Sequence, residues 1–316
     1  MDKIIFFNMN QLGDLLFSLP IIKAVREQYP NITIYSVIRK NLAGLLKETC
    51  LVDKIFVKEK SLKSKIKLIS DIKKENIDVA CLFSESPESL ITAYFSKIKK
   101  RYGFRTASLK FLLTDTVEKK GVPSLANNII LAKKLGINNI QKDYTNIIKV
   151  NNEIEKRTDI WLKNKNLENK NFVIISIGAS KRRQEKCLQQ SVWIEVLNKF
   201  IGKNIEPVVV GAVWEKADIE KIINKCNKQI KLFCPEGGLC ELAGLIKKAA
   251  LFIGIDSGTM HLAASLGIKC IALYGNTDPS QIGPQPLEKH IIIKKDSVKE
   301  ITAEDIIKEL NKINLG

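Results

Sequence analysis

A small group of residues that could bind a phosphorylated ligand stands between two apolar runs near the end of the chain. Residues 251–267 read LFIGIDSGTMHLAASLG and contain Asp256, Ser257, Gly258 and His261. The free N–H groups at a helix start bind phosphate, and small residues allow the phosphate to approach closely. A carboxylate does not favour a phosphate, so the acid is expected to cap the turn or to accept a sugar hydroxyl. A lone histidine on an apolar helix is usually a core residue, but a diphosphate joined to a hydroxylated group accounts for all four residues.

A second group follows an earlier apolar run, FVIISIG. Small residues come first and cations follow: Gly178, Ala179, Ser180, Lys181, Arg182, Arg183 and Lys186. Small residues expose backbone N–H groups, and cations neutralise phosphate oxygens. A solvated charge run is the alternative interpretation. The position directly after a strand favours ligand binding.

A third group lies at the first helix start, in NMNQLGDLLFSLP. Gly13 permits close backbone approach, and Asp14 suits the positive end of the helix dipole. Two interpretations of Asp14 remain open at this point. The carboxylate either caps the helix or faces a ligand and takes a proton from its hydroxyl.

Short apolar runs alternate with longer amphipathic stretches along most of the chain. Residues 3–9, 32–38 and 77–83 are typical of buried strands, and stretches such as 15–30 are typical of helices. A polar stretch at about 138–152 precedes a second series of the same kind. This β-α-β alternation predicts parallel sheets covered by helices.

Two such series predict an α/β protein with two doubly wound, Rossmann-like domains, residues 1–155 and 156–316. Ligands of these sheets lie beyond the carboxyl ends of the strands, where the three groups of candidates stand. The expected site is the cleft between the two domains. Neither a G-x-G-x-x-G fingerprint nor a Walker-type phosphate loop occurs in the sequence, which argues against a nicotinamide dehydrogenase and a P-loop kinase.

Composition further restricts the class of protein to which the chain can belong. The 45% hydrophobic fraction is typical of a soluble globular protein, and no apolar run reaches the roughly 18–20 residues of a membrane span. The N-terminal residues do not resemble a signal peptide. Seven scattered cysteines without a C-x-x-C pair indicate reduced thiols rather than disulfides or a zinc site. A cytoplasmic protein is therefore expected.

Three motifs together resemble family 9 glycosyltransferases, the lipopolysaccharide heptosyltransferase group. They are NQLGDLLFSLP, KCLQQSVW and GIDSGTMHLAASLGIKCIALYGNTDPSQIGP, and their order and spacing cover nearly the whole chain. The resemblance implies the GT-B fold, with the acceptor on the N-terminal domain and a nucleotide-sugar on the C-terminal one. It also implies that the closing helix can pack back on the first domain. Cys187, Leu188 and Gln189 depart from the family pattern, which usually has a basic or aromatic residue and then Trp-Pro.

The resemblance implies roles residue by residue. Asp14 matches the base that activates the acceptor hydroxyl, and Lys186 matches the lysine that steadies the departing diphosphate. The other donor-binding positions are Ser180, Glu215 toward the ribose, Asp256, Ser257, Gly258 and His261. No cofactor or metal is expected, because the sequence has no D-x-D pair to hold a divalent ion. Basic side chains could neutralise the leaving diphosphate instead.

Positive charge is concentrated in the first half of the chain. Residues 1–150 hold 26 basic and 14 acidic residues, a net of +12, out of +17 for the whole chain. Genome composition alone could explain this, but an acidic glycolipid at an anionic membrane face also fits. Residues 96–110 mix cations with aromatic residues, so Arg101 and Arg105, together with Gly13, are candidate acceptor contacts.

The sequence thus favours an inverting, metal-independent glycosyltransferase that moves heptose from ADP-heptose to the lipopolysaccharide inner core, either lipid A–Kdo or core heptose. Its expected partners are the nucleotide-sugar, the core glycolipid and, peripherally, the cytoplasmic face of the inner membrane, without nucleic acid. One alternative is another donor, such as a UDP- or ADP-hexose. The other is a non-catalytic module whose basic half binds nucleic acid, although no nucleic-acid recognition motif is present.

Overall fold

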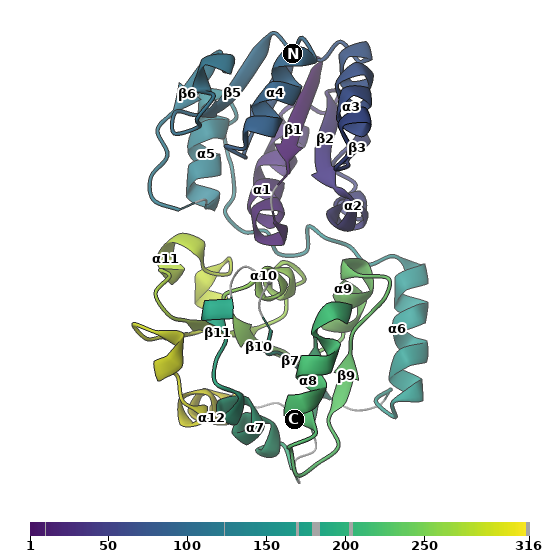
Figure 1. The fold of residues 1–316 in the computed structure, drawn as a ribbon, viewed down its shortest axis with the longest axis vertical. Helices are drawn as coiled ribbons and strands as arrows, with labels where there is room; N and C mark the ends of the chain where they lie inside the picture. Colours follow the sequence, from purple (N-terminus) through teal and green to yellow (C-terminus); the bar gives the residue numbers. More distant parts are fainter. Residues whose placement is uncertain (10, 123, 169–170, 179–183, 202–204, 314–316) are drawn as a thin grey trace. The chain divides into compact units, whose positions relative to one another are not determined.

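The computed structural model describes residues 1–316 except 10, 123, 169–170, 179–183, 202–204 and 314–316. The chain forms two compact units, Met1–Ile147 and Ile148–Gly316. Each unit is a six-stranded parallel sheet with helices on its faces (Figure 1). The predicted α/β class with two doubly wound parallel sheets is confirmed.

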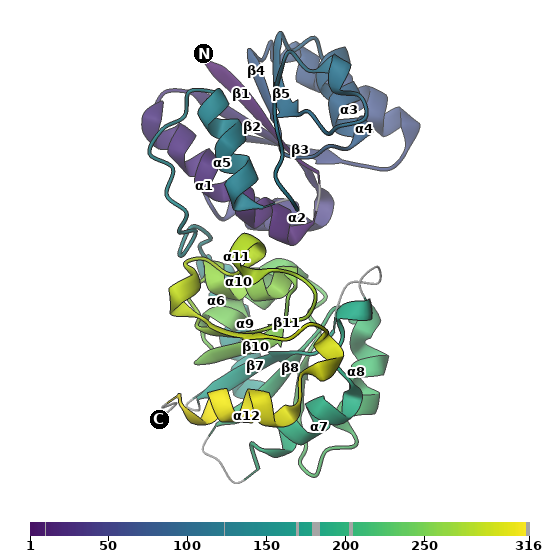
Figure 2. The ribbon, with the colours of Figure 1, turned by 90° about the vertical axis from the view of Figure 1, so that its left-hand side faces the viewer.

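The first unit has the strand order β3-β2-β1-β4-β5-β6. Figure 2 shows α1 and α5 on one side of this sheet and α3 and α4 on the other. Its strands and helices are β1 (Lys3–Asn8), α1 (Leu12–Gln28), β2 (Thr33–Arg39), α2 (Lys40–Lys47), β3 (Lys54–Lys58), α3 (Leu62–Lys74), β4 (Val79–Leu82), α4 (Pro87–Phe95), β5 (Lys100–Phe104), the 3₁₀ turn η1 (Lys110–Leu112), β6 (Asp115–Val117) and α5 (Leu125–Lys134).

The second unit has the strand order β12-β11-β10-β7-β8-β9. Helices α7, α8 and α12 pack together, as do α6, α9 and α10. Its elements are α6 (Asn152–Asn164), β7 (Phe172–Ser176), η2 (Gln184–Lys186), α7 (Gln190–Asn198), β8 (Glu206–Val210), η3 (Val213–Glu215), α8 (Lys216–Ile223), β9 (Lys231–Phe233), α9 (Leu239–Lys247), β10 (Leu251–Ile255), α10 (Gly258–Ser265), β11 (Cys270–Tyr274), α11 (Pro279–Ile282), η4 (Leu287–Lys289), β12 (Ile291–Lys294), η5 (Val298–Glu300) and α12 (Ala303–Asn311).

Both sheets reverse their strand order once, at equivalent places. In the first unit the reversal lies between β1 and β4, and in the second between β7 and β10. Ligands of open parallel sheets bind beyond the carboxyl ends of the strands at such a reversal. The segments after these four strands are therefore where each unit is built to hold a ligand.

The contacts of α6 and of the closing helix bear on the division between the units. The division lies at 147/148 instead of 155/156, because α6 belongs wholly to the second unit and packs on α9. Arg157 pairs with Glu241 at 3.1 Å, and Trp161 meets Phe233 edge to face. The closing helix, α12, likewise packs on α7, β11 and β12 of the second unit and does so through the buried core residues Ile306 and Leu310.

The sequence patterns do not predict five of the described strands and α-helices: β5, β6, α5, α11 and β12. Strand β5, with the sequence KRYGF, carries two cations, and β6 has only three residues. Neither offers the apolar run by which a buried strand is recognised. Across the described residues, no helix has the length and apolar character that crossing a bilayer requires.

Candidate functional site

In the first unit, the turn from β1 into α1 places Asp14 in the first turn of the helix. Its Oδ2 accepts the backbone N–H of Gln11 at 3.0 Å, and its Oδ1 accepts no hydrogen bond in the described structure. Burial raises the pKa of Asp14, while the Gln11 bond and the cations Arg39 and Lys119 lower it in part. Asp14 is therefore both a helix cap and a carboxylate of increased basicity with one free oxygen.

Neighbouring strand ends hold this turn in place. Arg39, at the end of β2, donates through Nε to the Met9 carbonyl at 2.9 Å. Asn8, at the end of β1, donates to Ser36 Oγ at 3.1 Å. The Oδ1 atom of Asn8 is buried without a hydrogen-bond partner among the described residues, although most buried polar atoms have one. A polar group of a bound molecule would satisfy it.

Across the reversal of the first sheet, Glu85 follows β4 and had not been expected from the sequence. Its carboxylate accepts hydrogen bonds from Lys119, after β6, and from Thr106, after β5. Arg105 lies in the same region and pairs with Glu118 at 2.8 Å, with both side chains exposed. Acidic and basic groups able to contact a charged, hydroxylated acceptor thus lie beyond β4, β5 and β6.

Arg101 is placed differently from Arg105. It stands near the amino end of β5, where its Nε donates to the Leu112 carbonyl at 2.6 Å and its Nη1 donates to the carbonyls of Ile98 and Lys99. These bonds occupy most of the guanidinium donors. These hydrogen bonds are made within the fold and give Arg101 a structural role, while its contact with the acceptor stays a prediction. Gly13 is the half-buried second residue of α1, directly before Asp14.

In the second unit, β10 runs into α10 through the motif of Asp256, Ser257 and Gly258. Ser257 caps the helix, its Oγ accepting the Met260 N–H at 3.4 Å. The amides of Gly258 and Thr259 donate to no acceptor in the described part of the chain. These are the free N–H groups with which a helix start holds an anion.

Asp256 is the centre of a polar cluster beside this helix start. Its Oδ2 pairs with Lys186 Nζ and accepts the Thr277 hydroxyl at 3.0 Å. Its Oδ1 lies 4.0 Å from His261 Nε2. Lys186 follows β7 and Asp256 follows β10, so the pair spans the reversal of the second sheet. Side-chain exposures of 16% for Lys186 and 8% for Asp256 make this the most buried ion pair across the described strand ends of the unit.

His261 is a neutral member of the cluster. Burial lowers its pKa to about 4, although the nearby Asp256 carboxylate raises it in part. At neutral pH the imidazole therefore orients neighbouring groups without adding a positive charge.

Glu215 follows the end of β8 and lies beside Gly178, the second residue after the end of β7. Its Oε2 accepts the Ala212 N–H at 2.7 Å, and burial raises its pKa. A Cβ built on Gly178 would come within 2.2 Å of Glu215 Oε1. The glycine therefore makes room for this carboxylate at the edge of the sheet.

The second unit thus brings Lys186, Glu215, Asp256, Ser257 and Gly258 to one edge of its sheet, as expected, together with His261. Ser180 and the cations at 181–183 lie outside the described residues. Thr277 was missed, although it lies in the NTDP segment of the third motif. Leu188 is buried in the core of the unit, so its departure from the family pattern changes packing there.

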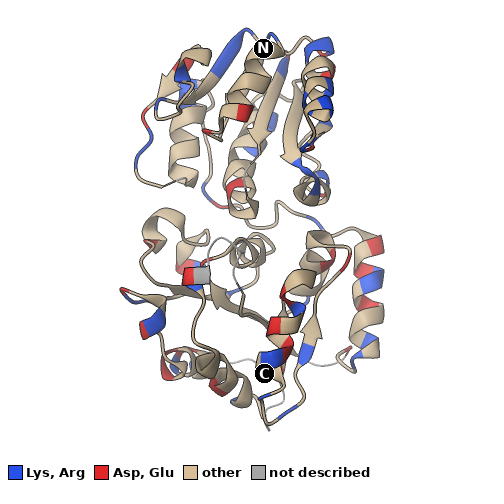
Figure 3. Cartoon of the chain, viewed as in Figure 1, with Lys and Arg blue, Asp and Glu red and all other residues tan. Residues whose placement is uncertain are grey.

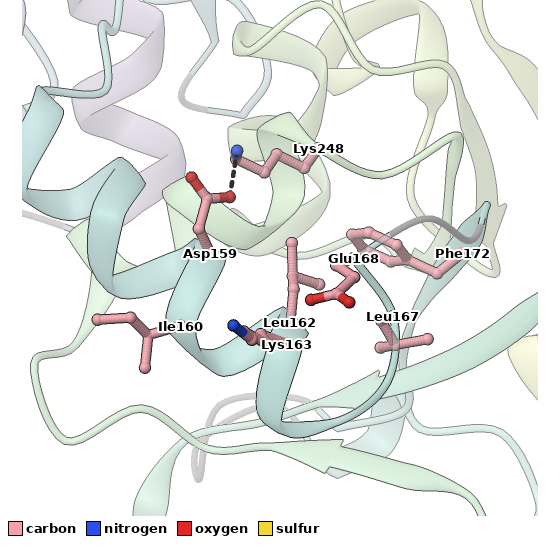
Figure 4. A pocket seen from close by; sticks show the side chains of 8 residues that line it. All are labelled: Asp159, Ile160, Leu162, Lys163, Leu167, Glu168, Phe172 and Lys248. Carbon is pink, nitrogen blue, oxygen red and sulfur yellow. Dashed lines mark hydrogen bonds and ion pairs between the residues drawn. The ribbon is translucent and has the colours of Figure 1, made fainter.

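A cavity of about 380 Å³ lies elsewhere, behind α6 and near the amino end of β7 (Figure 4). An ion pair between Asp159 and Lys248, at 2.5 Å, closes one side of it. Because it opens at the amino ends of the strands, it is separate from the cluster around Asp256. Across the described residues, no group of three or more His, Cys, Asp or Glu side chains could hold a metal ion.

Comparisons by sequence and by structure find similarity to the same family of proteins. The family model for glycosyltransferase family 9 (heptosyltransferase) matches residues 65–310. Lipopolysaccharide heptosyltransferase 3 of Escherichia coli (strain K12) is 24% identical over 289 residues, covering 85% of this chain and 81% of that protein. The solved family 9 glycosyl transferase from Veillonella parvula DSM 2008 superposes with a TM-score of 0.87 at 18% identity, covering 98% of this chain and 96% of that one. The E. coli ADP-heptose lps heptosyltransferase II gives 0.82 at 21%, covering 98% of each chain.

Proposed function

The chain belongs to glycosyltransferase family 9, and from this premise we propose that it transfers heptose from ADP-heptose to the lipopolysaccharide inner core. Relatives named as lipopolysaccharide and ADP-heptose heptosyltransferases support the choice of sugar and acceptor. Because the family consists of glycosyltransferases, the alternative of a non-catalytic nucleic-acid-binding module is set aside.

The observation that carries the proposal is the anion site at the reversal of the second sheet. The free amides of Gly258 and Thr259 begin α10, and the ammonium of Lys186 pairs with Asp256, directly before this helix start. A nucleoside diphosphate offers that site two phosphate groups, and the N-terminal dipole of α10 favours their charge. We assign the diphosphate to this helix start and the ribose hydroxyls to the free oxygen of Glu215.

The proposed reaction is a single displacement with inversion. Asp14 takes the proton of an acceptor hydroxyl as its oxygen attacks the anomeric carbon of the sugar. The bond from that carbon to the β-phosphate oxygen breaks on the opposite face, and ADP leaves with the electron pair. Lys186 and the α10 amides stabilise the charge that grows on the diphosphate, which is the task a divalent ion performs in other glycosyltransferases. No metal or cofactor is needed in this scheme.

The direct test is transfer from ADP-heptose to purified lipid A–Kdo and to heptosylated core, followed by identification of the glycosylated position and of the anomeric configuration. We expect one inverted glycosidic product in the presence of EDTA. Titration with ADP, UDP and GDP checks the donor separately. Binding of UDP alone would refute the heptose assignment and favour the alternative of a UDP-sugar donor.

The space at Gly178 leads to a prediction about nucleotide affinity. Alanine at position 178 would displace the Glu215 carboxylate, since its Cβ falls within 2.2 Å of Oε1. Because hydrogen bonds to charged groups contribute roughly 1.5–3 kcal/mol, Gly178→Ala and Glu215→Ala are each expected to weaken ADP binding about tenfold or more. Calorimetric titration measures both.

The double variant Gly178→Ala with Glu215→Ala separates displacement of the Glu215 carboxylate from general damage to the fold. If the two substitutions act through one carboxylate, Gly178→Ala adds no further loss once Glu215 is alanine. Additive losses would show that Gly178 affects ADP by another route. Asp218→Ala serves as a control on α8, because this acid is exposed and is expected to leave ADP affinity unchanged.

A further inference from the structure

Helix α4 carries apolar side chains on its exposed side as well as in the core, where Leu90 and Ala93 lie. Ser89 and Thr92 face the core with exposures of 0% and 4%, whereas Tyr94 and Phe95 are 46% and 58% exposed. Ser89 Oγ is buried without a hydrogen-bond partner among the described residues, which is unfavourable. The core is filled from the other side of the helix, so core packing does not account for the exposed Tyr94 and Phe95.

The neighbouring elements extend this apolar surface. Helices α3 and α4 lie side by side (Figure 2), joined by the 3.2 Å ion pair between Lys65 and Glu88. The turn η1 also packs against α4. We call the exposed apolar side chains of these three elements the α3–α4 patch: Leu62, Ile66, Ile91, Tyr94, Phe95 and Phe111.

Arg101 and ring contacts hold the aromatic part of the patch in a fixed position. The Arg101 guanidinium lies 5.4 Å from the centre of the Tyr94 ring and is itself bonded to the Leu112 carbonyl of η1. The rings of Tyr94 and Phe95 meet edge to face at 5.4 Å. Arg101 thus links α4 to η1, which gives this arginine a structural role in the patch.

Positive charge surrounds the patch. The acids within it are occupied, because Glu88 pairs with Lys58 and Lys65, and Asp71 pairs with Lys74. Figure 3 shows basic residues on successive turns of α3. Five exposed lysines of α3, of η1 and of the turn after α4 form no ion pair in the described structure: Lys63, Lys67, Lys97, Lys99 and Lys110.

We infer that the α3–α4 patch docks the protein on an anionic lipid bilayer, with the apolar side chains entering the headgroup layer and the lysines facing lipid phosphates. Exposed apolar side chains with unpaired lysines on the same and adjoining elements are suited to such an interface. A second copy of the chain fits less well, because it would bring the same unpaired lysines face to face. The inference rests on the proposed function only in that a lipid-linked acceptor lies in a membrane.

The test is co-sedimentation of the full chain with vesicles of phosphatidylglycerol and phosphatidylethanolamine. Two variants remove the apolar and the electrostatic contributions to membrane binding separately. One carries Tyr94→Ser, Phe95→Ser and Phe111→Ser, and the other carries Lys97→Gln, Lys99→Gln and Lys110→Gln. Because each lysine near an anionic surface and each buried apolar group adds to membrane affinity, each variant is expected to bind at least tenfold more weakly than the wild type.

A matched control places the same changes on an exposed face of the second unit, as Ile160→Ser with Lys156→Gln and Lys163→Gln. It is expected to bind vesicles as the wild type does, and 0.5 M salt should weaken wild-type binding. Equal binding by the patch variants, equal loss in the control, or equal binding to phosphatidylcholine vesicles would overturn the inference. So would a patch variant that changes only the oligomeric state in sedimentation velocity.

Sugar transfer to a soluble acceptor without acyl chains keeps the two proposals apart. The patch variants should retain wild-type turnover on that acceptor. If vesicle binding follows the patch but no sugar is transferred by any form, the proposed function fails and the docking surface stands.

Discussion

Turnover of the Asp14→Asn variant is expected to fall by about 10²-fold or more, with ADP affinity unchanged. Asparagine keeps the size of the side chain and an oxygen that can accept the Gln11 amide, so the helix cap survives. Only the ability to take a proton is lost. Steady-state kinetics and an ADP titration of the same preparation measure the two effects.

Asp305 provides a matched control for this variant. It occupies the equivalent capping position in α12, where its Oδ2 accepts the Thr302 N–H at 3.0 Å. Its pKa is lowered by that hydrogen bond, whereas burial raises the pKa of Asp14. Asp305→Asn should therefore leave turnover intact. Wild-type turnover in the Asp14→Asn variant would show that Asp14, like Asp305, serves only as a helix cap.

The raised pKa of Asp14 also sets the pH dependence. A general base works as the carboxylate, so kcat/KM should fall as pH drops through its folded-state pKa. Because burial moves that pKa above the ordinary value of 3.8, activity is expected to be lost at milder acidity than for an exposed aspartate. The pH profile of kcat/KM measures this limb, which should be absent from the residual activity of Asp14→Asn.

The Lys186→Met variant is expected to lose both stability and turnover. Removing one partner of a largely buried ion pair leaves the Asp256 charge without compensation, which costs about 3 kcal/mol of unfolding free energy. Removing a positive group that stabilises the leaving diphosphate is expected to lower kcat by about 10²-fold or more. Denaturant melts and steady-state kinetics measure the two losses.

Adding Asp256→Asn to the Lys186→Met variant separates the loss of stability from the loss of turnover. The double variant has no unpaired buried charge, so most of the stability should return while turnover should not. Recovery of turnover along with stability would mean that Lys186 acts only by holding the fold. Lys221→Met is the exposed counterpart, since the Lys221–Asp218 pair is about 70% exposed and should contribute at most about 1 kcal/mol.

The sequence predicts the parts of the fold and site that depend on local pattern. The apolar run 251–255 followed by Asp256 and Ser257 predicts a buried strand and a capped helix start, and the structure contains both. Strand β5 could not be predicted from such a pattern, because its sequence, KRYGF, has more polar than apolar character. Its basic residues were interpreted as one surface, but Arg101 and Arg105 lie toward opposite ends of the strand.

Contacts between distant segments could not be predicted in the same way. Lys186 and Asp256 are 70 residues apart, and they meet because β7 and β10 are neighbours in the sheet. Glu85 meets Lys119 for a similar reason, since β4, β5 and β6 are successive strands. A strand order is a property of the whole unit, so no single motif reveals these pairs. The exposure of Tyr94 and Phe95 on α4 also depends on how the helix packs.

The two units have separate cores, and this has a consequence for how the chain unfolds. The cluster around Ile5, Phe7 and Val37 and the cluster around Trp193, Ile253 and Ile306 share no residue. Because each cluster lies within one unit, we expect two cooperative transitions in a thermal scan of the free chain. A nucleotide bound at the proposed site on α10 is expected to raise the midpoint temperature of the second unit by mass action. Thermal scans with each ligand in turn therefore report which half of the protein the ligand has entered.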